Sequence, residues 1–308
     1  MKIVFAAPTY LPSRRANTLQ VMKMAQATRD LGHSIRLLVP DPGGGEVLDW
    51  GSLAHHYGLQ GKIDIEWLPV KAGFRGYDYG LKAVRYARRW GADLLYTRLP
   101  QAAAFASSLK IPTIFEVHDL PAGFMGPILF RSYLRGGGAC RLVLITKFLR
   151  DEISSKITPI PEPPFTLIEP DGVDLERYEN IPGPEDARRR LQKDQLPHLP
   201  VPTFTVGYTG HLYPGRGIDL ILDMATELPG YTFLLVGGNP KAVKEVQDEV
   251  DQRAIENVIL TGFVPNADLS LYQAACDVLL MPYQQSVAAS SGGDIAHFLS
   301  PMKLFEYL

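Results

Sequence analysis

Short apolar runs separated by helical patterns recur along the first 170 or so residues. Each run is rich in Val, Ile, Leu and Phe and lacks polar alternation, which is typical of strands buried on both faces of a parallel sheet. Apolar positions at three- and four-residue steps over Thr18 to Leu31, followed by Gly32, predict a helix between the first two runs. We expect strands in KIVFAA from Lys2, IRLLVP from Ile35, IDIEWLPV from Ile63, DLLYTR from Asp93, TIFEVH from Thr113 and RLVLIT from Arg141.

The same alternation begins afresh after a polar, Pro-rich stretch at 177–202. Strands are expected in FTVGYTG from Phe204, FLLVGG from Phe233, VILTGF from Val258 and VLLMPY from Val278, with helices at 218–227, 241–253 and 267–275. The pattern predicts an α/β protein with two Rossmann-like, doubly wound parallel-sheet domains, residues 1–172 and 203–308, joined by a linker at 173–202. Ligands are then expected at the carboxyl ends of the strands, in a cleft between the domains.

The last nine residues, SPMKLFEYL, read as the opening of a helix. Ser300 can serve as the N-cap and Pro301 as the first helical residue. The sequence stops about two turns later, whereas a doubly wound domain would add one or two further strands and helices. We therefore expect the second domain to be incomplete, and such a truncation could leave the 308-residue chain inactive.

Composition and charge narrow the possible classes. The 31 Lys and Arg residues against 33 Asp and Glu give no overall basic field, so nucleic-acid binding driven by counterion release is not expected. Two cysteines cannot build a disulfide framework or a thiolate metal site. The first residues lack the apolar core of a signal peptide, and no apolar run reaches the roughly 18 residues needed to span a bilayer. We expect a cytosolic protein, either soluble or attached peripherally to the inner face of the membrane.

One segment carries a basic face. In YGLKAVRYARRW from Tyr79, the residues Lys82, Arg85, Arg88 and Arg89 oppose apolar positions of the same helix. A basic face of this kind is usually only solvated. The alternative is contact with an anionic membrane or a lipid-linked acceptor.

Common catalytic signatures are absent from the sequence. No G-x-G-x-x-G follows a predicted strand, and there is no G-x-x-x-x-G-K-[ST], H-E-x-x-H or G-x-S-x-G. A nicotinamide dehydrogenase and the common hydrolase and kinase classes are therefore not expected.

Polar residues instead gather at junctions of strand and helix. In YTGHLYPGRGID, Gly210 allows close backbone approach at a strand end, and Arg216 stands before the next helix, where its planar fork can clamp a diphosphate. The helix at Pro301 offers unpaired N–H groups for an anion, with Lys303 in its first turn and Glu306 about one turn further. This combination suits a nucleoside diphosphate, with positive charge for the phosphates and a carboxylate for the ribose diol.

The order of these segments resembles the donor half of family 4 retaining glycosyltransferases of the GT-B fold. The matching segments are TGHLYPGRGID, LLVGG, LTGFVPNADLSLYQAACDVLLMPY and SPMKLFEYL. The first half is similar too, in ANTLQVMKMAQATRDLGHSIRLLVP, EVHDLP, ITKFLRDEI and EPDGVDLERY. The resemblance covers nearly the whole chain.

The resemblance assigns roles position by position. The family neutralises the donor diphosphate with a basic pair, and here His211 stands at the first position and Arg216 at the second. The second glutamate of the family's E-x7-E motif binds the ribose and corresponds to Glu306. The first falls on Phe298, so its contact is absent or is supplied by another group such as Asp294.

Further roles follow from the resemblance. The nucleobase would lie against Phe263 and Val264, and His118 in EVHDLP matches a first-domain histidine near the transferred sugar. Arg14, Arg15 and Asn17 would line the cleft. The implied catalytic residues are His118 and Arg216, and the implied donor-binding residues are Gly210, His211, Arg216, Gly237, Phe263, Val264, Pro301, Met302, Lys303 and Glu306.

These roles imply a retaining transferase that moves a sugar from a nucleoside diphosphate, such as UDP or GDP, to an acceptor hydroxyl, in surface polysaccharide or glycolipid assembly. No cofactor or metal is expected, because His, Cys and carboxylates do not cluster at ligand spacing in the sequence and the fold replaces a divalent cation with protein charges. Two alternatives stay open. A nucleotide-sugar epimerase of the same architecture would need carboxylates poised for acid and base work, and a noncatalytic fragment would bind the nucleotide without turnover.

Overall fold

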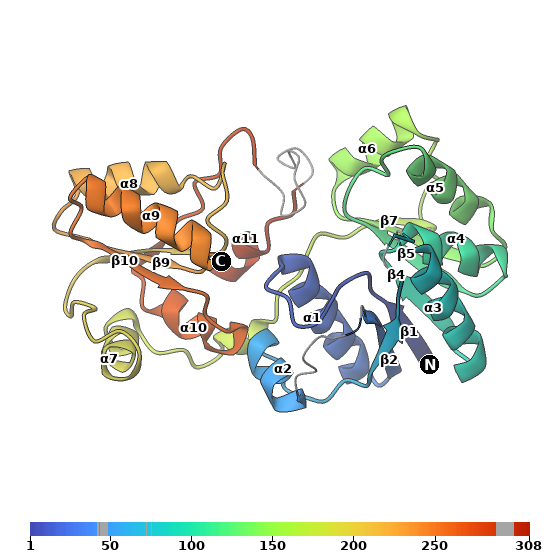
Figure 1. The fold of residues 1–308 in the computed structure, drawn as a ribbon, viewed down its shortest axis with the longest axis horizontal. Coiled ribbons are helices and arrows are strands. Elements are labelled where there is room, and N and C mark those ends of the chain that lie inside the picture. The colour runs from blue at the N-terminus through green and yellow to red at the C-terminus, as the bar shows by residue number, and fades with distance from the viewer. Residues whose placement is uncertain (42, 44–48, 72, 75, 288–298) are drawn as a thin grey trace. The chain divides into compact units, whose positions relative to one another are not determined.

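The chain divides into two compact units, which are described separately. The first holds Met1–Asp171 with Phe298–Ser300, and the second holds Gly172–His297 with Pro301–Leu308. The structure, a computed structural model, describes residues 1–41, 43, 49–71, 73–74, 76–287 and 299–308 (Figure 1).

The first unit is built on a seven-stranded parallel sheet in the order β3-β2-β1-β4-β5-β6-β7. The strand order reverses between β1 and β4, which is the point where an open α/β sheet offers a crevice beside its strand ends. The strands are β1 (Lys2–Ala6), β2 (Ser34–Asp41), β3 (Ile65–Pro69), β4 (Leu94–Thr97), β5 (Thr113–Val117), β6 (Ala139–Leu144) and β7 (Thr166–Ile168). The helices are α1 (Ala16–Asp30), α2 (Trp50–Tyr57), α3 (Tyr77–Trp90), α4 (Pro100–Ser108), α5 (Met125–Arg135) and α6 (Lys147–Lys156).

Helices cover both faces of this sheet, and β1 shows why the buried part of a strand is apolar on both sides. Ile3 and Phe5 of β1 pack into the cluster formed with α1 and α2, whereas Val4 and Ala6 pack into the cluster formed with α3 and α4. Successive side chains of a strand point to opposite faces, so a strand covered on both sides must be apolar at every position.

The second unit holds a four-stranded parallel sheet in the order β10-β9-β8-β11. Its strands are β8 (Thr205–Thr209), β9 (Thr232–Val236), β10 (Val258–Gly262) and β11 (Val278–Leu279). Its helical elements are the 3-10 helix η1 (Leu175–Tyr178) and α7 (Pro184–Asp194), α8 (Ile218–Glu227), α9 (Pro240–Gln252), α10 (Asn266–Ala274) and α11 (Met302–Tyr307). Only two residues of VLLMPY pair, because β11 bonds to β8 through Val206 and Gly207 alone.

The predicted fold class is confirmed, with two Rossmann-like parallel sheets, and the predicted strands fall within a few residues of their expected places. Other elements had no stated place in the prediction: the helices α2, α4, α5, α6 and α7, the 3-10 helix η1 and the three-residue β7. Residues 173–202, assigned to a linker, carry η1 and α7, and the buried Ala187 and Leu191 of α7 pack with the core of the second unit. Charge dominates that segment, so its narrow apolar stripe was not recognised.

Candidate functional site

A glycine lies at the carboxyl end of each of three neighbouring strands in the second unit. Gly210 follows β8, Gly237 follows β9 and Gly262 ends β10, each with positive φ. The Gly210 amide donates to the Val236 carbonyl at 2.8 Å and the Gly237 amide to the Gly262 carbonyl at 2.8 Å. A Cβ on Gly237 would lie 2.3 Å from the Gly210 carbonyl oxygen, so only glycine fits there.

Lys303 of α11 reaches this edge of the sheet. Its Nζ lies 2.7 Å from the position that a Cβ on Gly210 would occupy, so the absent side chain of Gly210 makes room for the amine. The Nζ stands 3.9 Å from the centre of the Tyr208 ring and 5.2 Å from that of Tyr283. The Arg216 guanidinium stands 4.6 Å from the same Tyr283 ring. We call Tyr208, Gly210, Arg216, Tyr283 and Lys303 the two-cation site.

Each cation of the two-cation site has a buried donor nitrogen that no described residue bonds. These are the Lys303 Nζ and the Arg216 Nε, which have no hydrogen-bond partner in the part of the chain that the structure describes. Burial, with Arg216 nearby, lowers the pKa of Lys303 to about 7, although Glu306 opposes the shift. An unsatisfied buried donor costs about 1–3 kcal/mol, and more when charged, so an anion with several oxygens would be stabilised here.

Glu306 belongs to a buried network beside this site. Its side chain and that of Arg177 are each 8% exposed, with Arg177 Nη1 3.8 Å from Glu306 Oε1. Gln273 Nε2 donates to Glu306 Oε2 at 3.3 Å and is itself held by Tyr178, whose hydroxyl donates to Gln273 Oε1 at 3.0 Å. Arg177 also donates to the Asn266 carbonyl at 2.7 Å. Residues of η1, α10 and α11 thus fix one carboxylate.

The helix start was predicted one residue too early. α11 begins at Met302 with Pro301 at its N-cap, whereas Ser300 was expected to cap it. The Ser300 hydroxyl instead accepts a hydrogen bond from the Asp171 amide at 2.9 Å. Since α11 has only six residues, we assign the recognition of an anion to side chains rather than to its N-terminus.

The remaining predicted donor residues lie at or near the same strand ends. The His211 ring stacks on Tyr213 with a centroid distance of 4.7 Å, and its carbonyl accepts from the Tyr208 hydroxyl at 2.6 Å. Phe263 and Val264 follow β10 and are half-buried. Asp294 and Phe298 lie outside the described residues.

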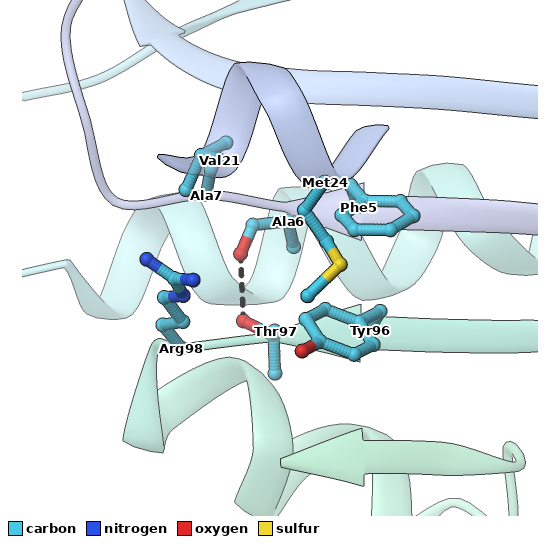
Figure 2. Close-up of a pocket in the computed structure, with 8 residues that line it drawn as sticks. All are labelled: Phe5, Ala6, Ala7, Val21, Met24, Tyr96, Thr97 and Arg98. Carbon is cyan, nitrogen blue, oxygen red and sulfur yellow. Dashed lines mark hydrogen bonds between the residues drawn. The ribbon is translucent and has the colours of Figure 1, made fainter. Parts of the chain in front are cut away.

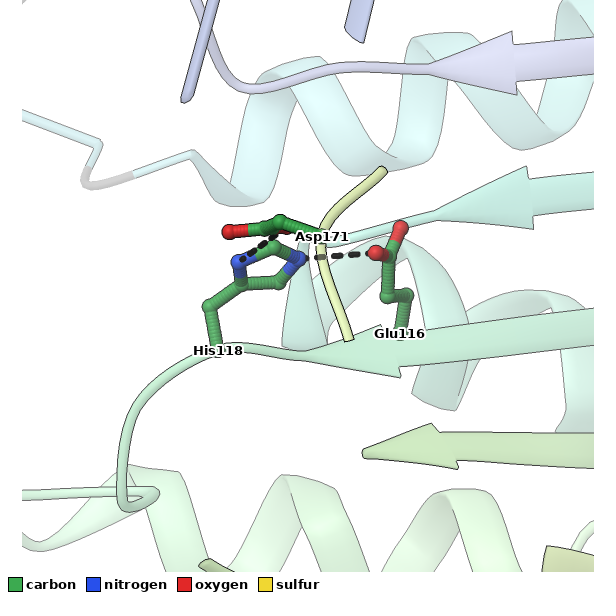
Figure 3. A group of neighbouring side chains, drawn as sticks. All are labelled: Glu116, His118 and Asp171. Carbon is green, nitrogen blue, oxygen red and sulfur yellow. Dashed lines mark hydrogen bonds and ion pairs between the residues drawn. The ribbon is translucent and has the colours of Figure 1, made fainter. Parts of the chain in front are cut away.

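The first unit holds a second polar cluster at the end of β5 (Figure 3). His118 Nε2 lies 2.8 Å from Glu116 Oε1, and His118 Nδ1 lies 3.9 Å from Asp171 Oδ1. Glu116 is 3% exposed. The imidazole is therefore held between two carboxylates, one from β5 and one from the segment that follows β7.

Arg98, which follows β4, anchors this cluster. Its Nε and Nη2 meet the two oxygens of Glu116 at 2.8 Å and 3.0 Å, a bidentate pair, and the Tyr96 hydroxyl donates to the same carboxylate at 2.6 Å. Arg98 also donates to Asn17 Oδ1 at 2.6 Å and to Gln20 Oε1 at 2.9 Å on α1. Of the three residues predicted from SRRAN, only Asn17 makes a described contact here, while Arg14 and Arg15 are exposed.

A small cavity of about 10 Å³ opens beside Arg98 (Figure 2), room for about one water molecule. In its wall, the Thr97 hydroxyl of β4 donates a hydrogen bond to the Ala6 carbonyl of β1 at 2.7 Å. It is lined by Phe5, Ala6, Ala7, Val21, Met24, Tyr96, Thr97 and Arg98.

The two carboxylates of the cluster differ in acidity. Burial alone would raise the pKa of Glu116, but the hydrogen bond from His118 and the charge of Arg98 outweigh it and hold the pKa at about 2. Burial raises the pKa of Asp171, and the charges of His118 and Arg98 only partly oppose it. Its Oδ1 is buried with no hydrogen-bond partner.

The expectation that His and carboxylates never cluster at ligand spacing is wrong for this trio. Ligand atoms of Glu116, His118 and Asp171 lie within 4.8 Å of one another, because the chain returns to β5 after β7. The residues do not suit a cation, however. Both Glu116 oxygens already accept from Arg98, whose positive charge would repel a metal ion. The arrangement is an ion-pair network that fixes the imidazole.

Sequence reasoning missed the residues that complete both sites. Tyr208 and Tyr283 look like core aromatics of buried strands, and Arg98 resembles a loop arginine. Arg177 stands in EPDGVDLERY without a stated role. The junction position after β4, the same signal that singled out Arg216, could have identified Arg98.

The two Rossmann-like parallel sheets are those of the GT-B fold, as the likeness to solved structures shows. Residues 203–300 match the family glycosyl transferases group 1. The structure is similar to Anabaena HepE in complex with UDP and glucose, with a TM-score of 0.63, 22% identity, and coverage of 91% of this chain and 73% of that chain.

Two curated relatives match in sequence. The 2-deoxystreptamine glucosyltransferase of Streptomyces kanamyceticus is 29% identical over 128 residues, 40% of this chain and 31% of that protein. A protein named as a teichuronic acid biosynthesis glycosyltransferase, TuaH of Bacillus subtilis, is 28% identical over 162 residues, 52% of this chain and 36% of that protein. The matched segments span about a third of the length of these relatives.

Proposed function

We propose that the protein is a glycosyltransferase that moves a sugar from a nucleoside diphosphate to an acceptor hydroxyl. The observation that carries the proposal is the two-cation site, where Lys303 and Arg216 present buried N–H groups without acceptors next to the buried carboxylate of Glu306. The match of residues 203–300 to glycosyl transferases group 1 supports it. The complex of Anabaena HepE with UDP and glucose supports UDP as the nucleotide.

The proposed mechanism uses charge that is already in place. As the sugar–phosphate bond breaks, negative charge grows on the leaving diphosphate, and Arg216 and Lys303 stabilise it without having to reorganise. The bond to the acceptor forms on the same face of the sugar, with retention, and the departing phosphate takes the proton of the acceptor hydroxyl. His118, held by Glu116, orients the sugar. Surface polysaccharide or glycolipid assembly is the proposed context.

Replacing Arg216 by methionine tests the donor site. Loss of a charge-assisted hydrogen bond is expected to weaken UDP binding by about 1.5–3 kcal/mol, roughly 10- to 150-fold, measured by calorimetry. Arg189→Met is the matched control, because Arg189 pairs with Glu185 on the surface of α7 and its side chain is 63% exposed. Equal UDP affinity in Arg216→Met and the control would contradict the assignment.

Activity is expected to be independent of divalent metal. The two cations would occupy the place where other transferases hold a metal. In the trio of Glu116, His118 and Asp171, the Glu116 carboxylate is already paired with Arg98 and His118. The measurement is UDP binding and turnover before and after treatment with a strong chelator. Loss of either, restored by magnesium or manganese, would refute the expectation.

The epimerase alternative draws on the same trio. A histidine between two carboxylates can give and take a proton, and the raised pKa of Asp171 favours a protonated carboxyl beside it. Glu116, in contrast, is bonded to Arg98 through both oxygens, which makes it a poor base. Incubation of a UDP-sugar without acceptor separates the reactions, because only an epimerase would release an altered sugar.

Contact with a membrane through α3 is a second, independent proposal. Arg85, Arg88 and Arg89 are exposed, whereas Lys82 donates to the Pro69 carbonyl. No helix among the described residues is long and apolar enough to cross a bilayer. Sedimentation with anionic vesicles, compared between the wild type and Arg85→Ser, measures the contact, and equal binding would dismiss it. A cytosolic location stays a prediction.

A further inference from the structure

The buried Lys303 amine is surrounded mainly by aromatic rings and by another cation, which are not hydrogen-bond acceptors of the ordinary kind. From β8 it faces the ring of Tyr208 at 3.9 Å, and from the segment after β11 it faces the ring of Tyr283 at 5.2 Å. The Arg216 guanidinium, in the segment between β8 and α8, lies 4.6 Å from the centre of the same Tyr283 ring. None of these side chains offers a carboxylate, and the Nζ has no hydrogen-bond partner within residues 1–287 and 299–308 as far as the structure describes them.

Among the described residues, the carboxylate that acts on the amine is that of Glu306, and it is already engaged elsewhere. Glu306, on α11 itself, favours the charged amine but lies 3.8 Å from Arg177 and accepts a hydrogen bond from Gln273. The tyrosines that face the site stay neutral at physiological pH, because burial raises the pKa of Tyr208 and of Tyr283. Tyr307 of α11 is likewise neutral, since burial raises its pKa too.

We propose that the Lys303 amine takes up a proton from solvent when a diphosphate binds beside it and Arg216, so that binding of the donor nucleotide is coupled to proton uptake. The inference rests on the proposed function, since the anion is the diphosphate of the sugar donor. The nitrogen lone pair accepts the proton, the neutral amine becomes an ammonium ion, and no bond of the ligand breaks.

The balance of charge explains the coupling. In the empty site burial and Arg216 hold the pKa of Lys303 at about 7, so a large share of the amine is neutral above that pH. A phosphate oxygen within hydrogen-bond distance favours the ammonium ion and returns the pKa toward the ordinary lysine value. Proton uptake therefore grows as the pH rises from about 7 to 8 and approaches one proton for each nucleotide bound.

The sign of the pH dependence follows directly. A group whose pKa rises on binding strengthens binding below its pKa in the empty site and loses that contribution as the pH rises through and above it. UDP affinity is expected to fall about twentyfold between pH 7.5 and pH 9 for a rise from about 7 to an ordinary lysine value. The terminal phosphate of UDP does not contribute to this fall, because its second pKa is about 6.

The test is calorimetric titration of the 308-residue chain with UDP at pH 8, in buffers of different ionisation enthalpy. The wild type should take up about 0.9 proton for each UDP bound. Lys303→Arg, with a guanidinium that stays charged, should bind UDP with uptake near zero and with equal affinity at pH 7.5 and pH 9. Lys241→Arg is the matched control, because Lys241 is an exposed lysine of α9, and it should keep the wild-type uptake.

Two results would overturn the inference and leave the proposed function intact. One is UDP binding by the wild type without proton uptake at pH 8. The other is the same proton uptake in Lys303→Arg as in the wild type. If Lys303→Arg does not fold, Lys303→Met takes its place, and loss of proton uptake in that variant is the expected result. Sulfate, which carries no proton that titrates in this range, separates the two proposals. Sulfate binding with uptake, but no UDP binding, would show that an anion couples to proton uptake at this site but would refute both the donor nucleotide as its ligand and the proposed function, and binding of neither would overturn both proposals.

Discussion

Replacing Glu116 by glutamine is expected to lower the free energy of unfolding of the chain by about 3–5 kcal/mol, the cost of breaking a buried ion pair at one partner. The substitution keeps the shape of the side chain but removes the anion that faces Arg98, whose side chain is only 7% exposed. It also leaves one acceptor oxygen where the carboxylate offered two, so Arg98 and His118 can no longer both be satisfied as they are by Glu116. For a unit of this size, about 2–4 °C of melting temperature is lost for each kcal/mol.

The control is the double variant Arg98→Met with Glu116→Gln. Removing both charges leaves no uncompensated ion, so the double variant should recover part of the stability lost in Glu116→Gln. Glu66→Gln is a matched single change, because Glu66 of β3 accepts only one described hydrogen bond, from Tyr86 at 3.1 Å. A Glu116→Gln protein as stable as Glu66→Gln would show that the network around His118 does not stabilise the fold.

The same carboxylate makes stability depend on acid. Its pKa of about 2 lies below the ordinary value of 4.5, so the stability it contributes is fully present above about pH 4.5 and is lost as the pH falls toward 2. The difference corresponds to about 3 kcal/mol. Asp171 acts in the opposite sense, because its raised pKa favours the folded state as it becomes protonated. Comparison with Glu116→Gln across this range isolates the contribution of Glu116.

Local composition is what made the fold predictable. A strand such as β1 is covered on both faces and is therefore apolar at each of its buried positions, Ile3 to Ala6, and this pattern is visible in a few consecutive residues. The helix α7 lacks such a signal, because only Ala187, Arg188 and Leu191 of its eleven residues are buried. β7, with three residues, is too short for any pattern.

The sites were predictable only where a residue stands at a junction. Arg216 and Glu306 could be proposed from their places beside a strand or helix end. The approach of Asp171 to His118 and of Lys303 to Tyr208 depends on how distant segments return to one sheet edge, which no local pattern records. Tyr208 illustrates the difficulty: its ring is fully buried, as a core residue would be, yet it forms a wall of the two-cation site.

Replacing Glu306 by glutamine is expected to weaken UDP binding by about 10- to 150-fold, the worth of hydrogen bonds to a charged group, which is about 1.5–3 kcal/mol. A carboxylate accepts hydrogen bonds from both hydroxyls of a ribose, whereas an amide accepts at one end only. The position favours this role, because η1 and α10 fix the carboxylate through Arg177 and Gln273 beside the two-cation site.

A nucleotide without the 2′-hydroxyl separates ribose binding from a general disturbance of the site. The wild type should bind UDP more tightly than 2′-deoxyuridine diphosphate. In Glu306→Gln this difference in affinity should shrink, because the hydrogen bond between the 2′-hydroxyl and Glu306 is lost both when the hydroxyl is removed and when the carboxylate is replaced. Arg177→Gln is the matched control for the buried pair. It removes the cation at 3.8 Å from Glu306 and keeps the carboxylate, so it should lower stability but preserve discrimination between the two nucleotides. If Glu306→Gln discriminated between them as the wild type does, the ribose would be held by another group, and Glu306 would serve only to pair with Arg177.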